Sequence, residues 1–292
     1  MVRHLPRVKA QLTLPAHRKV RSLLEGDYES IQLGRSMELN DLREYVRGDD
    51  VRDVEWKASA RSGQLLVKQF EARRAHTVLL AVSTARTMAA VDDTLAPKRD
   101  LAVFVTGALG WLALRHGDRV AVVHGSTDGV RLHPPAGGEA ALERALGAIH
   151  DTTTPGSGEP DVAALLEQAS RLRRRTILVV VTDEHPVDEH LADALTRASV
   201  RHELLYVTIG DADPTRPRQA TLADLATGSV VPGWVQADPV LLREYAEAVA
   251  AETAARRRTL GRLGIPYETV TDRRTALTSL HRLLRRPARA RR

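Results

Sequence analysis

The sequence has no cysteine and no long apolar run. Without cysteine, the chain can form neither disulfides nor thiolate metal sites, and it has no thiol nucleophile. No run approaches the roughly 18 apolar residues of a membrane-spanning helix, and the N-terminus lacks the apolar core of a signal peptide. These absences lead us to expect a cytoplasmic protein without a membrane span.

Signatures of nucleotide binding and of serine hydrolysis are also missing. No phosphate loop of the form G-x-x-x-x-G-K-[ST] occurs, and the glycines at 156 and 158 lack both a preceding strand and the third glycine of a dinucleotide fingerprint. Residues 125–129 read G-S-T-D-G, with threonine where a nucleophile elbow needs serine, and this pattern is typical of a turn between strands. The sequence therefore predicts a protein that is not an enzyme.

The net charge of +6 is concentrated at one end of the chain. Residues 273–292 contain eight arginines and no acid, which leaves 35 basic residues (43 minus 8) against 37 acidic ones in the remainder. A basic tail can bind nucleic acid, anionic lipid or an acidic protein. Leu277, Leu280 and Leu284 recur at helical spacing, so we expect the first half of the tail to dock as a helix and regard nucleic-acid binding as the weaker interpretation.

Short apolar segments alternate with amphipathic segments from residue 77 onward. The apolar segments predict strands at 77–82, 119–124, 176–181, 203–209 and 267–271 with an edge strand at 129–133, and the segments between them predict helices at 97–115, 139–149, 161–172, 187–199 and 238–263. Such alternation favours parallel βαβ units with right-handed crossovers. The expected fold is α/β, a doubly wound and mostly parallel sheet with a long C-terminal helix, spanning residues 76–286.

The segment from Thr77 to Met88 organises this prediction. Its first six residues are almost wholly apolar with β-branched residues at both ends, which indicates a strand buried on both faces. In open parallel sheets, ligands bind at the carboxyl ends of central strands. The loop from Ser83 to Thr87, together with Asp183 after another buried strand, is therefore expected to face one crevice.

A run of acids and histidines after Asp183 offers ligand types that metals use, but its spacing is unsuitable. His185 and His190 are five residues apart with a proline between them, and Asp188 and Glu189 stand where the first turn of a helix favours acids. We interpret this run as a capped helix start.

Residues 1–75 lack the strand and helix periodicity and are expected to form an N-terminal appendage, with a basic tail at 287–292. Between Arg47 and Arg61, eight of fifteen residues are charged, four of them basic and four acidic. Such balance favours internal pairing over phosphate binding, and Trp56 supplies an apolar group that the segment can bury.

The stretch from Asp41 to Glu71, D-L-R-E-Y-V-R-G-D-D-V-R-D-V-E-W-K-A-S-A-R-S-G-Q-L-L-V-K-Q-F-E, closely resembles the signature of the bacterial family called domain of unknown function fifty-eight. The strand at 77–82 stands where that family begins a von Willebrand factor A-like domain. The resemblance implies a doubly wound fold of that type. Family members are frequently found beside MoxR-type AAA+ ATPases and are thought to act with them on other proteins. Many begin with two membrane helices, so this chain looks like a shorter soluble form.

The resemblance also implies the position of a metal-ion-dependent adhesion site. Such a site uses Asp-x-Ser-x-Ser after the first strand, a threonine from a later loop and an aspartate after the fourth strand. Here Ser83 replaces the aspartate, Ala85 replaces the first serine, Thr87 keeps a hydroxyl, and Asp183 matches the second aspartate. Magnesium prefers several oxygen ligands that include carboxylates. With Arg86 adjacent, we expect a degenerate site without a cofactor, whose residues Ser83, Arg86, Thr87 and Asp183 contact proteins instead.

Three functions remain open at this point. The favoured one is a non-enzymatic interaction module that acts as adaptor of a MoxR-type AAA+ ATPase on client proteins. A second is a magnesium- or manganese-dependent binding protein or hydrolase that uses Asp183 with Asp92, Asp93 or Asp161. A third is nucleic-acid association through the arginine-rich C-terminus. The later threonine of the adhesion site has no firm match, because any of residues 159–161 could stand in its place.

The family signature itself has two interpretations. Its residues are Arg43, Tyr45, Gly48, Asp49, Asp50, Arg52, Trp56 and Lys57. They could form a binding site, or a paired polar network that locks the appendage onto the sheet domain. Equal numbers of opposite charges beside Trp56 suit a satisfied buried network, so we favour the structural role.

Overall fold

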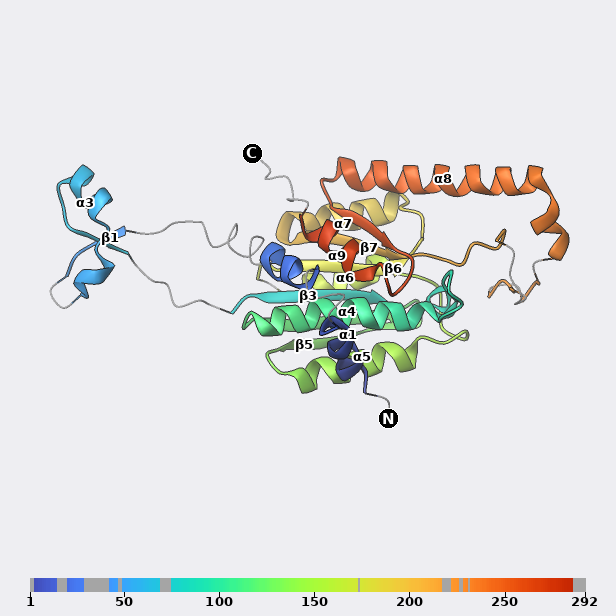
Figure 1. The fold of residues 1–292 in the computed structure, drawn as a ribbon, viewed down its shortest axis with the longest axis horizontal. Helices are drawn as coiled ribbons and strands as arrows, with labels where there is room; N and C mark the ends of the chain where they lie inside the picture. Colours follow the sequence, from blue (N-terminus) through green and yellow to red (C-terminus); the bar gives the residue numbers. More distant parts are fainter. Residues whose placement is uncertain are drawn as a thin grey trace.

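The computed structural model of the chain describes residues 3–14, 20–28, 42–46, 49–68, 75–172, 174–216, 222–225, 228–230 and 232–285. Figure 1 shows a layered α/β domain and, drawn well apart from it, a small unit that contains α3 and β1. No helix within the described ranges has the length and apolarity needed to cross a bilayer.

A six-stranded sheet forms the centre of the domain. Its strands are β3 (Thr77–Ser83), β4 (Arg119–Ser126), β5 (Gly129–Ala136), β6 (Ile177–Asp183), β7 (Glu203–Ile209) and β8 (Tyr267–Val270), in the spatial order β5-β4-β3-β6-β7-β8. Only β5, at one edge, runs antiparallel to its neighbour. The predicted doubly wound, mostly parallel sheet is confirmed.

Helices cover both faces of this sheet (Figure 1). They are α1 (His4–Leu12), α4 (Lys98–Arg115), α5 (Glu139–Thr152), α6 (Val162–Ser170), α7 (Glu189–Arg201), α8 (Pro239–Arg262) and α9 (Ala276–Arg285). Alternate residues of β3 supply the two cores, since Leu79 and Ala81 pack with α6 and α7, while Val78, Leu80 and Val82 pack with α1, α4, α5 and α9.

Helix α4 is buried on nearly every side rather than along one stripe. Fourteen of its eighteen residues are buried, because α1, α5 and α9 pack around it on the side away from the sheet. A helix that is apolar all round is typical of such an interior position. The sequence pattern had predicted only one inward face.

The first helix belongs to the sheet domain. Leu5, Val8 and Leu12 of α1 are part of the core on the α4 side, and the carboxylate of Glu143 on α5 accepts hydrogen bonds from the backbone N–H groups of His4 and Leu5 at 2.7 and 2.6 Å. An anion at this end satisfies donors that a helix leaves unpaired.

A second N-terminal helical segment, residues 20–28, joins the same core through Leu24 and Tyr28. The hydroxyl of Tyr28 donates to Asp118 at 2.6 Å. The expected appendage of residues 1–75 is therefore corrected, because residues 4–12 and 20–28 contribute to the core of the sheet domain. Only the later part of that stretch forms a unit of its own.

That later part, residues 42–46 and 49–68, is called the signature unit below. It contains strand β1 (Leu42–Glu44), the short helix η2 (Val51–Asp53), helix α3 (Trp56–Ser62) and strand β2 (Leu66–Lys68), which pairs antiparallel with β1. Gly63 ends α3 with a φ of 71°, a left-handed conformation that favours glycine at this position.

The C-terminal part follows the sequence prediction closely. Helix α8 starts at Pro239, and the side chain of Asp238 before it accepts from the backbone N–H of Val240 at 2.8 Å. Helix α9 buries Leu277, Leu280, Leu283 and Leu284, so the first half of the basic tail docks as a helix. The expected tail at 287–292 lies outside the described residues.

Two histidines stack where β4 pairs with β5. The rings of His124 and His133 lie 5.2 Å apart, and His124 is only 1% exposed. Burial, and then the neighbouring His133 and Arg131, lower the pKa of His124 to about 4. Burial also lowers the pKa of His133, with Arg144 and Arg131 acting in the same direction.

We predict that acid destabilises the fold through His124. Its pKa is about 4 in the folded chain against about 6.5 when unfolded, so the unfolded state binds more protons between these values. The contribution of His124 to the free energy of unfolding is then fully present above pH 6.5. It falls as the pH drops towards 4, by about 3 kcal/mol at most. Urea unfolding across this range measures the effect, and His124→Gln should flatten the dependence. An unchanged slope in that variant contradicts the prediction.

We also predict that α1 stabilises the sheet domain. Val8 is 1% exposed, so Val8→Ala should lower the free energy of unfolding by about 1–3 kcal/mol. Arg7→Ala, on the exposed side of the same helix, is the matched control and should change it little. Equal unfolding midpoints for Val8→Ala and the unaltered chain would show that α1 is not part of the folding unit.

Candidate functional site

Parallel pairing brings the ends of β3, β6 and β7 to one edge of the sheet. Val82 lies beside Val181 in the register, and Asp183 lies beside Ile209. The loops that leave these strands therefore start close together. The loop between α5 and α6, residues 153–161, reaches the same edge, because the N–H of Arg86 donates to the carbonyl of Gly158. We call residues 83–87, 153–161 and 183–185 the mouth.

The first segment of the mouth is held by its own backbone. Ser83 is fully buried, and its hydroxyl accepts weakly from the N–H of Ala85 at 3.4 Å. The N–H of Thr84 donates to the carbonyl of Gly125 at 2.9 Å. The Oγ1 of Thr87 is buried and has no hydrogen-bond partner among the described residues. Of the two hydroxyls at adhesion-site positions, only that of Thr87 is therefore uncommitted.

Arg86 links the first and second segments of the mouth. Its backbone N–H donates to the carbonyl of Gly158 at 3.0 Å, and its guanidinium forms an ion pair with the carboxylate of Glu159. The N–H of Glu159 in turn donates to the hydroxyl of Thr127 at 2.9 Å. A positive and a negative side chain thus stand between the two loops. Glu159, one of the residues weighed for the later threonine, is an ion-pair partner here.

Gly158 is required by this tight arrangement. Its N–H donates to the carboxylate of Asp128 at 2.5 Å. A Cβ at this position would lie 2.3 Å from the hydroxyl oxygen of Thr127 and 2.8 Å from a carboxylate oxygen of Asp128. Any side chain would therefore push the second segment away from the turn between β4 and β5.

Asp183 lies in the third segment, at the end of β6. It is 6% exposed, and its carboxylate accepts from the hydroxyl of Thr182 at 3.0 Å. Glu184 follows, and its pKa is raised by burial, although the guanidinium of Arg256 acts in the opposite direction. The mouth thus holds one buried aspartate beside a glutamate that titrates at a higher pH than usual.

Arg256, on α8, is a buried cation that sequence reasoning missed. It is 3% exposed. Its guanidinium donates to the carbonyls of Glu184 and His185 and, at 3.2 Å, to the hydroxyl of Tyr267. An arginine at helical spacing from buried Leu260 is the one sequence signal that could have found it. Arg256 fastens the third segment of the mouth to α8.

A second missed cation is Lys98, at the start of α4. Its side chain is fully buried, and its Nζ lies 2.5 Å from the carboxylate of Asp211, which follows β7. The N–H of Asp211 also donates a long hydrogen bond, 3.4 Å, to the carboxylate of Glu184. Positive charge is therefore built into the protein on this side of the mouth as well.

The other carboxylates considered as metal ligands or catalytic groups are engaged elsewhere. Asp92 accepts from the N–H groups of Thr94 and Ala96 within a turn. Asp93 forms an ion pair with Arg216 at 2.9 Å, and Asp161 accepts from Ala164 as the N-cap of α6. Within the described residues, no three histidine or carboxylate side chains gather as a metal ion would need.

The acidic run after Asp183 is a helix start, as predicted. Asp188 is the N-cap of α7, and its carboxylate accepts from the N–H of Leu191 at 2.8 Å. Glu189 occupies the first turn.

Among the described signature residues, four side chains are exposed to solvent, those of Asp50, Arg52, Trp56 and Lys57. Trp56 is 63% exposed. Arg52 forms an ion pair with Asp50, and their side chains are 92% and 58% exposed, respectively. Lys57 is exposed as well. Gly48 and the side chain of Arg43 lie outside the described residues. For Asp50, Arg52, Trp56 and Lys57, the buried network that we favoured from the sequence is therefore corrected, because these side chains face solvent.

Residues 41–255 match a protein family model described as "Protein of unknown function DUF58". Uncharacterized protein Rv1480 of Mycobacterium tuberculosis and Uncharacterized protein Mb1516 of Mycobacterium bovis are each 26% identical over 267 residues, which is 90% of this chain and 83% of each relative.

Solved structures resemble the chain more distantly. An aerotolerance-related membrane protein from Bacteroides fragilis is 14% identical, with a TM-score of 0.45 over 72% of this chain and 98% of that one. A von Willebrand factor type A protein from Catenulispora acidiphila is also 14% identical, with a TM-score of 0.40 over 76% and 43% of the two chains. The family match spans well over half of the sequence, and the chain belongs to the family of proteins of unknown function DUF58, as its signature from Asp41 to Glu71 predicted.

Proposed function

We propose that this chain is a non-enzymatic protein-interaction module that uses its mouth to contact other proteins without a metal ion. The observation that carries the proposal is the ion pair between Arg86 and Glu159. This ion pair joins two loops. In a metal-ion-dependent adhesion site, residues of both loops would bind the same metal ion. A guanidinium at this place supplies the positive charge that an ion would otherwise bring.

The oxygen atoms at the mouth do not suit a hard divalent cation. The side chain of Ala85 has no oxygen, and Ser83 provides a hydroxyl where the adhesion site has a carboxylate. Asp183 is the one aspartate at a matching position. The free Oγ1 of Thr87 fits an ion, but a single hydroxyl with one aspartate falls short of the six oxygens that magnesium takes. The engagement of Asp92, Asp93 and Asp161 in a turn, an ion pair and a helix cap argues against a hydrolase built on Asp183.

Membership of the family supports a more specific partner. Because members of the family are frequently found beside MoxR-type AAA+ ATPases, we propose that the chain is an adaptor between such an ATPase and a client protein, in the cytoplasm. The side chains proposed to make contact at the mouth are Ser83, Arg86, Thr87 and Asp183. Of these, the partly exposed Arg86 and Thr87 are the most accessible.

Titration with magnesium or manganese tests the metal-free mouth. Calorimetry of the purified chain should give no saturable heat at millimolar metal, because the mouth lacks the carboxylate that Ser83 replaces. Asp183→Asn serves as the matched control and should give the same trace. A saturable signal that disappears in Asp183→Asn would reject the metal-free mouth.

Charge removal at the mouth tests the contact itself. Arg86→Gln should weaken binding to a purified MoxR-type ATPase, while costing at most about 1 kcal/mol of stability, since the ion pair is half exposed. Arg115→Gln is the matched control. It breaks the ion pair with Glu25 at the C-terminal end of α4, and it should leave binding unchanged. Surface plasmon resonance with the purified ATPase measures both. Equal affinities of the two variants would rule out Arg86 as a contact.

A further inference from the structure

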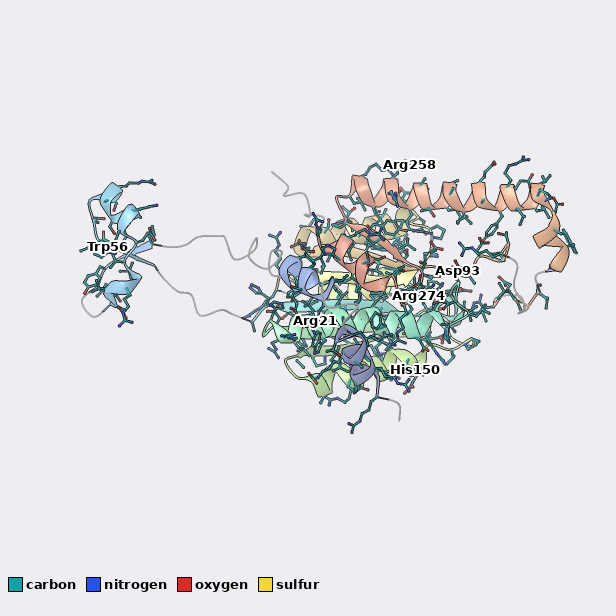
Figure 2. The ribbon with its side chains drawn as sticks, in the orientation of Figure 1. Arg21, Trp56, Asp93, His150, Arg258 and Arg274 are labelled. Carbon is teal, nitrogen blue, oxygen red and sulfur yellow. The ribbon has the colours of Figure 1, made fainter. Side chains whose placement is uncertain are left out.

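The signature unit exposes an unusual share of its apolar side chains. Val46, Val51, Trp56 and Leu65 are 61%, 59%, 63% and 50% exposed. Scattered apolar residues are normal on a protein surface, but four large ones within so short a segment are typical of a contact surface. Figure 2 labels Trp56 on this unit, far from the side chains of the sheet domain.

The exposure is not caused by a poorly formed backbone. The N–H of Tyr45 donates to the carbonyl of Leu65 at 2.8 Å, and the N–H of Glu55 donates to the carbonyl of Leu66 at 2.9 Å. These bonds hold β2 against both the segment after β1 and the start of α3. Trp56 is therefore presented next to a strand, on a framework with defined hydrogen bonds.

The unit is too small to bury these groups itself. Among its described large apolar residues, only Val54 and Val67 are buried, at 5% and 3% exposed. Segments of this size usually need a metal, a disulfide or a partner to supply the missing core. The chain has no cysteine, and the described residues offer no metal-binding cluster, whereas a partner protein can supply the missing apolar contacts.

The charged side chains of the signature unit indicate which charge the partner carries. The carboxylates of Asp49 and Asp50 already accept from the backbone N–H groups of Val46 and Arg52, at 2.9 and 3.0 Å. Lys57 and Arg61, one turn apart on α3, are exposed and form no ion pair with the acids of the described segments. Asp49 and Asp50 thus shape turns, while the side chains of Lys57, which follows Trp56 in the chain, and of Arg61 are exposed and available.

We propose that the signature unit is a docking surface for a partner protein that presents an acidic rim around an apolar pocket. Trp56 fills the pocket, and Lys57 and Arg61 pair with the rim. A large aromatic anchor surrounded by charge is the usual composition of an interface hot spot. Four acids balance four bases between Arg47 and Arg61, so the unit lacks the net positive charge that nucleic-acid binding needs, and a protein fits this surface better. This surface is independent of the mouth and does not rest on the function proposed for it.

Binding of synthetic peptides to the full chain tests the proposal. The probe is a fluorescein-labelled twelve-residue peptide that alternates leucine with glutamate, compared with peptides in which lysine replaces glutamate or serine replaces leucine. Fluorescence anisotropy should show that the leucine–glutamate peptide binds most tightly. Trp56→Ala, and separately the double variant Lys57→Glu with Arg61→Glu, should each weaken it about tenfold or more.

Trp234 supplies the matched control, because it is 65% exposed on η4 (Gly233–Ala237), outside the signature unit. Trp234→Ala should leave the affinity unchanged. Equal peptide affinities of Trp56→Ala and Trp234→Ala overturn the proposal, as does tighter binding of the lysine peptide or of duplex DNA. A fall in melting temperature for Trp56→Ala also overturns it, since the indole would then pack on its own chain.

Discussion

The parallel pairing of β3 with β4 and β6 is the constraint on which the rest of the structure depends. It buries an apolar run on both faces, and it requires that the loops after these strands leave from the same edge of the sheet. Ser83 and Asp183, a hundred residues apart in the sequence, lie at the ends of neighbouring strands for this reason. Any function at this edge uses groups whose spacing the sheet has already set.

Fixed charges of the protein fill the surroundings of that edge. Arg86 pairs with Glu159, Lys98 with Asp211, and Arg256 holds the carbonyls after Asp183. A buried lysine or arginine is tolerated only where acceptors surround it. The loops are thus connected to one another and to α4 and α8 by side chains of the chain itself.

Much of the fold could be predicted from the sequence, because its strands are apolar runs and its helices have clear starts. The run from Thr77, the cap at Asp188 and the proline start of α8 each have a local physical cause that a sequence displays. The pattern could not reveal the packing of α1 on α4, because an amphipathic segment of nine residues does not show which surface it covers.

The candidate site was less predictable for a related reason. The residues that the resemblance aligns with an adhesion site could be compared position by position, but the partners of Arg86, Lys98 and Arg256 come from distant parts of the chain. For Trp56, balanced charges suggested a buried network, yet a unit with two buried valines has no interior to hold one. Burial depends on how much chain surrounds a residue, and composition alone does not contain that information.

We propose that a protein cation, rather than a metal, connects the loops of the mouth. A crystal structure grown in manganese, with anomalous differences recorded, tests this directly. We expect no anomalous peak within bonding distance of Thr87 and Asp183, with the Arg86 and Glu159 pair intact. A peak coordinated by those two residues, with Arg86 turned away, would contradict it.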